Sequence, residues 1–265
     1  MPLPQTAPIT SRSNRQAKRL DMLLRNKKAR EESGEFALEG ARLCLDALER
    51  GVAVLCVLLT LSAYKKNPAL EGLVSAAGEV AWLDESLAAR LGDTQNPQGI
   101  FCVCKTPSLT HTAVPICGDG RYLLLHGVRD PGNLGAILRT AAAFGADGAF
   151  LCDCAELFSP KVLRASMGGV WRLPAAVCPD MTGKIRELRE AGVKVYAATP
   201  QGDAKSPDCL SGRHGRAVLI GSEGDGLPET LISLCDTALA IPMQGGSESL
   251  NAAVAAGILL WEMLK

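Results

Sequence analysis

The second half of the chain alternates short apolar segments with longer helical segments, and this alternation constrains the fold more than any other feature. Strands are expected at residues 122–128, 148–154, 193–199, 217–222 and 238–243. This order predicts an α/β fold with a mainly parallel sheet and helices on both faces. Ligands of such sheets bind at the loops that follow the carboxyl ends of the strands. We therefore expect a binding cleft at loops 129–133, 199–203, 221–226 and 242–249.

The first half of the chain has the pattern of a smaller α/β domain. Strands are expected at residues 36–40, 52–61, 80–84 and 99–105, with helices at 41–49, 67–78 and 85–92. Between residues 106 and 120 this pattern gives way to Pro, Gly, Ser and Thr, which is typical of a linker. We expect a first domain over residues 1–107, a linker over 108–120 and a second domain over 121–265.

Charge and hydropathy exclude several classes of protein. Lys plus Arg and Asp plus Glu both number 28, so the chain is neither a basic tail protein nor an acidic disordered chain, and any nucleic-acid affinity must be local. The longest apolar run, Val52 to Tyr64, is shorter than the roughly 18 residues of a membrane span. Residues 1–20 lack the apolar core of a secretion signal, so we expect a cytoplasmic protein.

The ten cysteines predict neither a disulfide framework nor a metal site. A long intracellular chain with a large core generally keeps its thiols reduced. Cys102/Cys104 and Cys152/Cys154 have C-x-C spacing inside apolar runs, whereas zinc sites use C-x2-C spacing or nearby histidines. The histidines of the chain are His111, His126 and His214. We expect no metal cofactor, and thiols that fill the core.

One segment departs from the neutral charge balance. From Thr10 to Arg30 the chain carries eight basic residues against one acid, Asp21. The interspersed leucines predict a helix with one buried stripe and a basic remainder. Charge alone favours a solvated helix face over an RNA-binding surface. The eight basic residues are Arg12, Arg15, Lys18, Arg19, Arg25, Lys27, Lys28 and Arg30.

The loop after the first strand of the second half turns through residues 130–132 into a helix that is expected to begin at about Asn133. The side chain of Asn133 could cap that helix, and Arg139 would lie in its second turn. Residues six apart do not occupy adjacent rows of a helix, but a loop-borne Asn133 could fold back beside Arg139. This segment alone leaves open whether the two residues form a site or are a simple cap and a surface residue.

The two later loops are rich in glycine. Residues 221–226, GSEGDG, have the spacing G-x-x-G-x-G and lack the Lys-Ser/Thr of a P-loop, so they predict close backbone approach to a ligand and not a phosphate cradle. Glu223 in this loop could pair with Arg139. The last loop passes Gly245 and Gly246 into a terminal helix that is expected near Ser249, which alone would be an ordinary helix cap. Polar groups in three such loops at one sheet edge predict a binding cleft.

Three ordered motifs, DPGNLGAILRTAAAFG, VLIGSEGDGLPE and IPMQGGSESLN, resemble those of the SpoU (TrmH) family of S-adenosylmethionine-dependent RNA ribose 2′-O-methyltransferases. SPKVLRASMGGVWRLP also resembles the family pattern. SRSN, FALEG and NPQGIFCV resemble its L30e-like substrate-binding domain. The resemblance covers nearly the whole chain. It implies a SPOUT-class α/β fold with a C-terminal trefoil knot, and a homodimer.

The resemblance also implies roles for individual residues. Arg139 is the key catalytic residue, and we expect it to position the target phosphate because an arginine stays protonated in proteins. Asn133 and Glu223 would orient Arg139, while Ser249 and Asn251 would serve the hydroxyl and the turn around the methyl donor. The residues expected at the donor slot are Thr199, Gly221, Ile241, Met243 and Leu250.

An RNA substrate changes the interpretation of the basic segment, which becomes a plausible phosphate-contacting surface. Aromatic residues are only 4% of the chain, which favours recognition of folded RNA over stacking on single strands. The expected RNA-binding residues are Arg12, Arg15, Lys18, Arg19, Lys27, Lys28 and Arg30.

The N-terminal domain resembles those of ribosomal RNA enzymes, so we expect 23S ribosomal RNA as the substrate. A transfer-RNA 2′-O-methyltransferase and a non-catalytic RNA-binding assembly factor are the alternatives. The assembly factor predicts loss of Arg139 or Asn133, and both are present. A base-methylating relative remains open. A dinucleotide-binding dehydrogenase is excluded because the turn after the first strand, RDPGNLG, lacks the spacing G-x-G-x-x-G.

Overall fold

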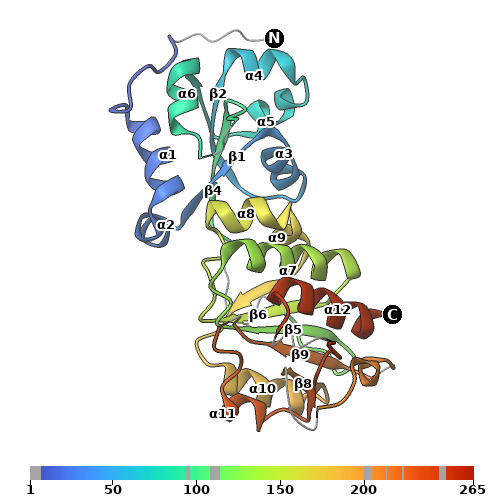
Figure 1. Cartoon of the computed structure of the whole chain (residues 1–265). Coiled ribbons are helices and arrows are strands. Elements are labelled where there is room, and N and C mark those ends of the chain that lie inside the picture. The colour runs from blue at the N-terminus through green and yellow to red at the C-terminus, as the bar shows by residue number, and fades with distance from the viewer. Residues whose placement is uncertain are drawn as a thin grey trace. The chain divides into compact units, whose positions relative to one another are not determined.

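The computed structural model describes residues 7–93, 96–107, 114–199, 204–212, 214–222, 224–244 and 249–265. The chain divides into two compact units (Figure 1). The first comprises Met1–Pro107 and Phe158–Leu163, and the second comprises Ser108–Leu157 and Arg164–Lys265. Residues 108–113 of the expected linker lie outside the described residues. Val114, which follows them, is buried in the core of the second unit.

The first unit contains a four-stranded mixed sheet. Its strands lie in the order β1-β4-β2-β3, with β4 antiparallel to both of its neighbours and β2 parallel to β3. Since β2 and β3 are parallel, Thr60 and Leu83 bring their carboxyl ends to the same edge of the sheet. The strands are β1 Glu35–Glu39, β2 Val54–Thr60, β3 Glu79–Leu83 and β4 Ile100–Lys105.

Helices cover both faces of this sheet (Figure 1). Helices α1 and α6 pack on one face around a core that includes Leu20, Leu87 and Phe101, and α3 and α5 lie on the other face. The helices are α1 Arg15–Arg25, α2 Lys27–Ser33, α3 Ala41–Glu49, α4 Leu61–Lys66, α5 Leu70–Ala76 and α6 Glu85–Leu91. The expected basic helix is divided at Asn26, which ends α1 and caps α2 by accepting a bond from the Ala29 N–H at 3.2 Å.

The second unit contains a six-stranded sheet in which every neighbouring pair is parallel, as the alternating pattern predicts. The order is β10-β8-β9-β5-β6-β7, so the chain continues from β5 to one side and then returns to the other side of β5. Ligand sites of open parallel sheets form where the strand order reverses in this way. The strands are β5 Arg121–His126, β6 Gly148–Cys152, β7 Ala175–Val177, β8 Lys194–Ala198, β9 Arg216–Ile220 and β10 Thr237–Leu239.

Helices cover both faces of this sheet as well. Helices α7 and α12 lie side by side on one face, and α10 lies on the other (Figure 1). None of the described helices combines the length and the apolar character that a membrane crossing needs. The helices of this unit are α7 Pro131–Phe144, α9 Gly169–Arg172, α10 Met181–Glu190, α11 Glu229–Ile232 and α12 Ala252–Leu264, and Pro207–Leu210 forms a 3-10 turn. Helix α8 Pro160–Ser166 begins in the first unit and ends in the second.

Three local expectations are wrong. Strand β7 is absent from the predicted strands, because its three residues are too few to show a periodicity. Helix α7 begins at Pro131 and not at Asn133, since Asp130 is its cap and accepts a bond from the Asn133 N–H at 2.7 Å. Helix α12 begins at Ala252 and not near Ser249, because Asn251 caps it.

The ten cysteines are free thiols, and most of them are buried. Cys102 and Cys104 are fully buried on β4, as expected for thiols that fill a core. Burial raises the pKa of the Cys104 thiol, so this thiol stays protonated at neutral pH.

Candidate active site

A cavity of about 560 Å³ lies at the carboxyl edge of the parallel sheet of the second unit. We call it the donor cavity. The ends of three neighbouring strands line it, with Ala198 on β8, Ile220 on β9 and Leu239 on β10. Its volume is within the range of roughly 300–1,000 Å³ that is typical of small-molecule sites. The strand order therefore forms a pocket at the edge where the sequence predicts one.

The five residues expected at the donor slot all line this cavity: Thr199, Gly221, Ile241, Met243 and Leu250. They come from three loops that are far apart in the sequence. Ser249, expected to serve the hydroxyl, also lines the cavity. The structure thus brings together residues that the motifs only place in order along the chain.

The glycine-rich loop after β9 is folded tightly back on itself. The Ser222 carbonyl accepts a bond from the Gly226 N–H at 3.2 Å, and the Ser222 hydroxyl accepts one from the Asp225 N–H at 3.1 Å. Gly226 has a φ of +67°, which favours glycine. A Cβ on Gly221 would lie 2.4 Å from the Gly226 carbonyl oxygen. The loop can therefore close beside the cavity only because residue 221 has no side chain.

A hydrogen bond joins the first motif to the third. The Asn251 Nδ2 donates to the Asn133 Oδ1 at 3.0 Å, although the two residues are 118 positions apart. The Asn251 Oδ1 accepts bonds from the N–H groups of Ala253 at 3.0 Å and Val254 at 3.3 Å, so the same side chain caps α12. This contact fixes the first turn of α7 to the start of α12. Leu250, next to Asn251, lines the donor cavity.

Arg139 is exposed on α7 and forms no hydrogen bond or ion pair with any residue that the structure describes. Asn133 is not borne by a loop that could fold back beside Arg139, because it lies within the first turn of α7. Positions six apart on one helix are about 9 Å apart along its axis. Glu223, the other expected partner of Arg139, lies outside the described residues. An Arg139–Glu223 pair therefore stays a prediction.

The motifs assign no role to the strand-end residues that line the donor cavity. Ala198, Ile220 and Leu239 look like ordinary core positions in the sequence, and only the rule that parallel strands bind ligands at their carboxyl ends could have selected them. Asp225 was also missed, and among the described lining residues it is the one with a charge. The cavity thus offers a carboxylate and apolar walls.

Three possible metal ligands lie together at the ends of β5 and β6. One donor atom each of His126, Cys152 and Asp153 lies within 4.8 Å of the others. Burial and the Asp153 charge raise the pKa of the Cys152 thiol, which makes its deprotonation for metal binding more costly. The expectation of no metal cofactor stays a prediction.

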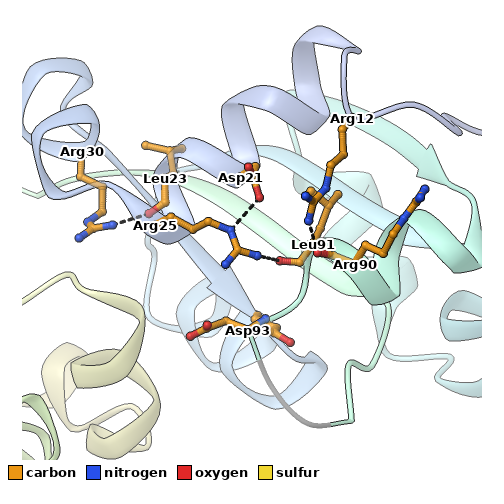
Figure 2. A network of polar contacts seen from close by, with 9 residues as sticks. Arg12, Asp21, Leu23, Arg25, Arg30, Arg90, Leu91 and Asp93 are labelled. Atoms are coloured by element: carbon orange, nitrogen blue, oxygen red, sulfur yellow. Dashed lines mark hydrogen bonds and ion pairs between the residues drawn. The ribbon is translucent and has the colours of Figure 1, made fainter.

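The basic segment of the first unit is partly used in internal contacts (Figure 2). The Arg12 guanidinium donates to the Arg90 carbonyl at 2.5 Å, and that of Arg25 donates to the Leu91 carbonyl at 3.5 Å. Both contacts cap the last carbonyls of α6. Arg19 forms a two-bond ion pair with Glu35, at 2.9 and 2.6 Å.

The expectation that Arg30 contacts RNA is wrong. Its side chain is only 7% exposed and donates to the Leu23 carbonyl at 2.6 Å, where it caps the end of α1 (Figure 2). A guanidinium buried in this way cannot reach a phosphate. Lys27 and Lys28 are exposed and form i,i+4 pairs with Glu31 and Glu32.

Arg15 and Lys18 form the unpaired part of the predicted RNA surface. Both side chains are exposed on α1, and neither makes a hydrogen bond or ion pair within the described part of the chain. They lie three positions apart and so share one helix face.

Comparison with known proteins identifies families for both units. The model of the SpoU rRNA methylase family matches residues 120–261, and that of the MRM3-like substrate binding domain matches residues 14–102. The 23S rRNA (guanosine(2553)-2′-O)-methyltransferase RlmP of Bacillus subtilis is 32% identical over 241 residues, which are 91% of this chain and 92% of that protein. The 23S rRNA (uridine(2479)-2′-O)-methyltransferase of Streptomyces viridochromogenes is 31% identical, over 99% of this chain and 93% of that protein.

A solved structure agrees with these matches. The crystal structure of the SpoU methyltransferase AviRb from Streptomyces viridochromogenes, in complex with AdoMet, superposes with a TM-score of 0.85 and 28% sequence identity. The superposition covers 95% of this chain and 97% of that one. Since the family model matches more than half of the chain and these relatives align along nearly all of it, this protein belongs to the SpoU rRNA methylase family.

Proposed function

We propose that this protein transfers a methyl group from S-adenosylmethionine to a ribose 2′-hydroxyl of 23S ribosomal RNA. One observation carries the proposal: residues of the second and third family motifs line the donor cavity, and the Asn133–Asn251 bond joins the helix of the first motif, which carries Arg139, to the start of α12 beside that cavity. The two 23S rRNA relatives described above act on ribose 2′-oxygens, which supports the same chemistry here.

The residues of the donor cavity fit S-adenosylmethionine. Its adenosine needs apolar walls and backbone hydrogen-bonding groups, which Ile241, Leu250 and the Gly221 loop provide. The donor carries a sulfonium cation and no phosphate, and Asp225 supplies a negative charge where a phosphate site would need a positive one. The sulfonium makes the bound methyl group electrophilic.

The residues of the chain must activate and place a neutral hydroxyl, which is a poor nucleophile. An arginine stays protonated, so Arg139 acts by holding the phosphate beside the target ribose and by stabilising the negative charge that develops on the 2′-oxygen. Asn133 and Asn251 fix the start of α7, and Ser249 lines the cavity where the ribose would meet the donor. Holding both reactants in contact provides a large part of the rate enhancement.

The experiment that tests this function is mass spectrometry of nucleosides from 23S ribosomal RNA and transfer RNA of cells with and without the gene. The expected result is the loss of one 2′-O-methyl nucleotide from 23S ribosomal RNA. Loss of a 2′-O-methyl nucleotide from transfer RNA instead would mean that transfer RNA, and not 23S ribosomal RNA, is the substrate. No lost mark in cells that express the protein would favour the non-catalytic assembly factor.

The RNA-contacting surface of the first unit is proposed to lie on the exposed face of α1. The double variant Arg15→Ala/Lys18→Ala should weaken RNA binding and flatten the plot of log affinity against log salt by about one unit per lost phosphate contact. Fluorescence titrations at several salt concentrations measure both effects. Arg186→Ala/Lys194→Ala, which neutralises two exposed residues of the second unit, is the control. Equal salt slopes for the two double variants would mean that the exposed side of α1 is only a solvated helix face.

The partner of the second unit is proposed to be another copy of this chain. Phe144 on α7 and Val254, Ile258 and Trp261 on α12 are 39%, 52%, 37% and 56% exposed, which is unusual for large apolar side chains on neighbouring helices. The Phe144 and Trp261 rings are 5.7 Å apart. This apolar surface suits a two-fold interface, in which the same patch meets itself.

Trp261→Glu should convert the dimer into monomers, because a carboxylate would be buried without a partner at the interface. Light scattering coupled to size exclusion measures the mass. Arg186→Glu, an exposed change on α10, should leave the mass unchanged. A Trp261→Glu protein with the parent mass would place the interface elsewhere.

The trefoil knot and the cytoplasmic location complete the proposal. Both loops that would form the knot, after β9 and after β10, line the donor cavity. A protein that methylates ribosomal RNA would act on it in the cytoplasm. Both statements stay predictions.

A further inference from the structure

A second cavity, of about 470 Å³, lies within the first unit. We call it the N-terminal cavity. Its polar lining comes from Ser62, Lys66, Asn67, Glu85 and Gln98. Small apolar side chains, among them alanines and a proline, form the walls between these groups. The sequence motifs assign no role to any of the five polar residues.

The N-terminal cavity lies at the edge of the sheet where parallel strands β2 and β3 end. Ser62 and Lys66 are on α4, which follows β2, and Glu85 is in the first turn of α6, which follows β3. Gln98 precedes β4. The position corresponds to the carboxyl edge at which α/β sheets bind ligands.

Internal hydrogen bonds hold the lining groups in place. The Gln98 Oε1 accepts a bond from the Ala41 N–H at 2.8 Å, and the Glu85 Oε1 accepts one from the Ser62 N–H at 3.3 Å. Gly99, with a φ of +67°, lies so close to Thr60 that a Cβ would be 2.8 Å from the Thr60 hydroxyl oxygen. The side chains that line the cavity are therefore largely ordered before a ligand arrives, which lowers the entropic cost of binding.

The charges of the lining narrow the class of ligand. The Lys66 ammonium attracts an anion, but the Glu85 carboxylate opposes a purely anionic ligand such as a phosphate alone. Asn67 and Gln98 each carry an amide, which both donates and accepts hydrogen bonds. A ligand that matches has apolar surface, an edge with donors and acceptors, and one negative charge. An unpaired nucleotide has all three, since protein side chains bind splayed-out RNA bases by their edges.

We propose that the N-terminal cavity binds one unpaired nucleotide of the substrate RNA, with its base edge at Glu85 and its phosphate near Lys66. This inference rests on the proposed function and adds a base-reading site to it. Guanine suits Glu85, because its N1–H and N2–H donors lie side by side and match the two oxygens of a carboxylate. The basic face of α1 contacts phosphates only, whereas this cavity reads a base.

The test compares the affinity of the full-length protein for 23S ribosomal RNA between matched variants. Glu85→Gln keeps the oxygen that accepts the Ser62 N–H bond but removes the charge. If Glu85 served only as a surface acid, its removal would tighten RNA binding, because the protein would become less negative. If it holds a guanine edge, Glu85→Gln should weaken binding by about tenfold. The control is Glu71→Gln, an exposed acid in the first turn of α5 that does not line the cavity.

A second pair of variants tests the phosphate contact. Lys66→Ala should weaken binding more than Lys65→Ala, although both lysines are exposed in the last turn of α4, because only Lys66 lines the cavity. The affinity for S-adenosylmethionine should not change in any of the four variants, because none of these residues lines the donor cavity. Losses of RNA affinity therefore report on the RNA site and not on the donor site.

The outcomes separate this inference from the proposed function. If the parent protein binds and methylates 23S ribosomal RNA but Glu85→Gln binds as well as or better than the parent, the N-terminal cavity does not read a base. A second result would also overturn the inference: guanosine monophosphate slows hydrogen exchange at the cavity but does not compete with RNA for binding. The cavity would then be a site for a free nucleotide. If the parent neither binds nor methylates this RNA, the proposed function fails, and the inference fails with it.

Discussion

Replacing Arg139 with alanine should abolish methyl transfer while S-adenosylmethionine still binds and the second unit stays folded. Arg139 is exposed on α7, and its guanidinium stabilises no described neighbour, so its loss costs the fold little. The donor cavity does not include it. Loss of one group that stabilises developing negative charge typically lowers the rate by about 10²- to 10³-fold. Here the phosphate contact is lost as well, so we expect at least that decrease.

Single-turnover transfer of a labelled methyl group to 23S ribosomal RNA measures this effect, with calorimetry for donor binding. Arg139→Lys keeps the charge but not the planar fork of donors, so it should recover only a small part of the rate. Arg186→Ala, an exposed arginine on α10 at the opposite face of the sheet, should behave as the parent. An Arg139→Ala enzyme with parental single-turnover rate would exclude Arg139 from the chemistry.

The parallel sheet of the second unit could be predicted because each of its five longer apolar segments has a turn signal after it. The predicted segment at 238–243 is only partly a strand. Only Thr237–Leu239 forms strand β10, and Ile241 and Met243 beyond it line the donor cavity. Apolar residues of a strand and apolar residues of a ligand pocket look alike in a sequence, since both avoid water.

The contacts within the site could not be predicted from spacing. The Asn133–Asn251 bond joins residues 118 positions apart, and only the strand order brings their helices together. The family resemblance selected both residues without indicating that they touch. It assigned Asn133 to the orientation of Arg139, a role that stays a prediction, and it did not indicate that the Asn133 side-chain oxygen accepts a bond from Asn251.

The basic segment shows why charge counts alone do not define a binding surface. Arg15, Arg19 and Arg30 contribute equally to the charge of residues 10–30. In the structure the first is exposed, the second is paired with Glu35 and the third is buried against the Leu23 carbonyl. A long guanidinium side chain can cap a helix as readily as it can contact RNA. Only the environment of the side chain in the fold distinguishes an arginine that caps a helix from one that can contact RNA.

Gly221→Ala should weaken the binding of S-adenosylmethionine by about tenfold. The new Cβ would lie 2.4 Å from the Gly226 carbonyl oxygen and 2.8 Å from the Leu227 nitrogen. Both are backbone atoms, so no side chain can rotate away, and the turn from residue 221 to residue 226 must open. Gly221, Ser222 and Gly226 all line the donor cavity, so opening the turn changes its wall. Strain of this kind costs about 1–3 kcal/mol, and 1.4 kcal/mol is a factor of ten in affinity.

Gly224→Ala is the matched control for this variant, because Gly224 belongs to the same loop and also lines the donor cavity, but a Cβ there would have no atom of the protein within 4 Å. Calorimetry at one temperature gives the donor affinity of both proteins, and thermal unfolding shows whether either is destabilised as a whole. We expect Gly224→Ala to bind the donor nearly as the parent does. Parental donor affinity in both alanine variants would mean that the loop after β9 does not shape the donor site. If Gly221→Ala alone loses affinity while both variants unfold at the parental temperature, then the closed turn is needed for the donor and not for the fold.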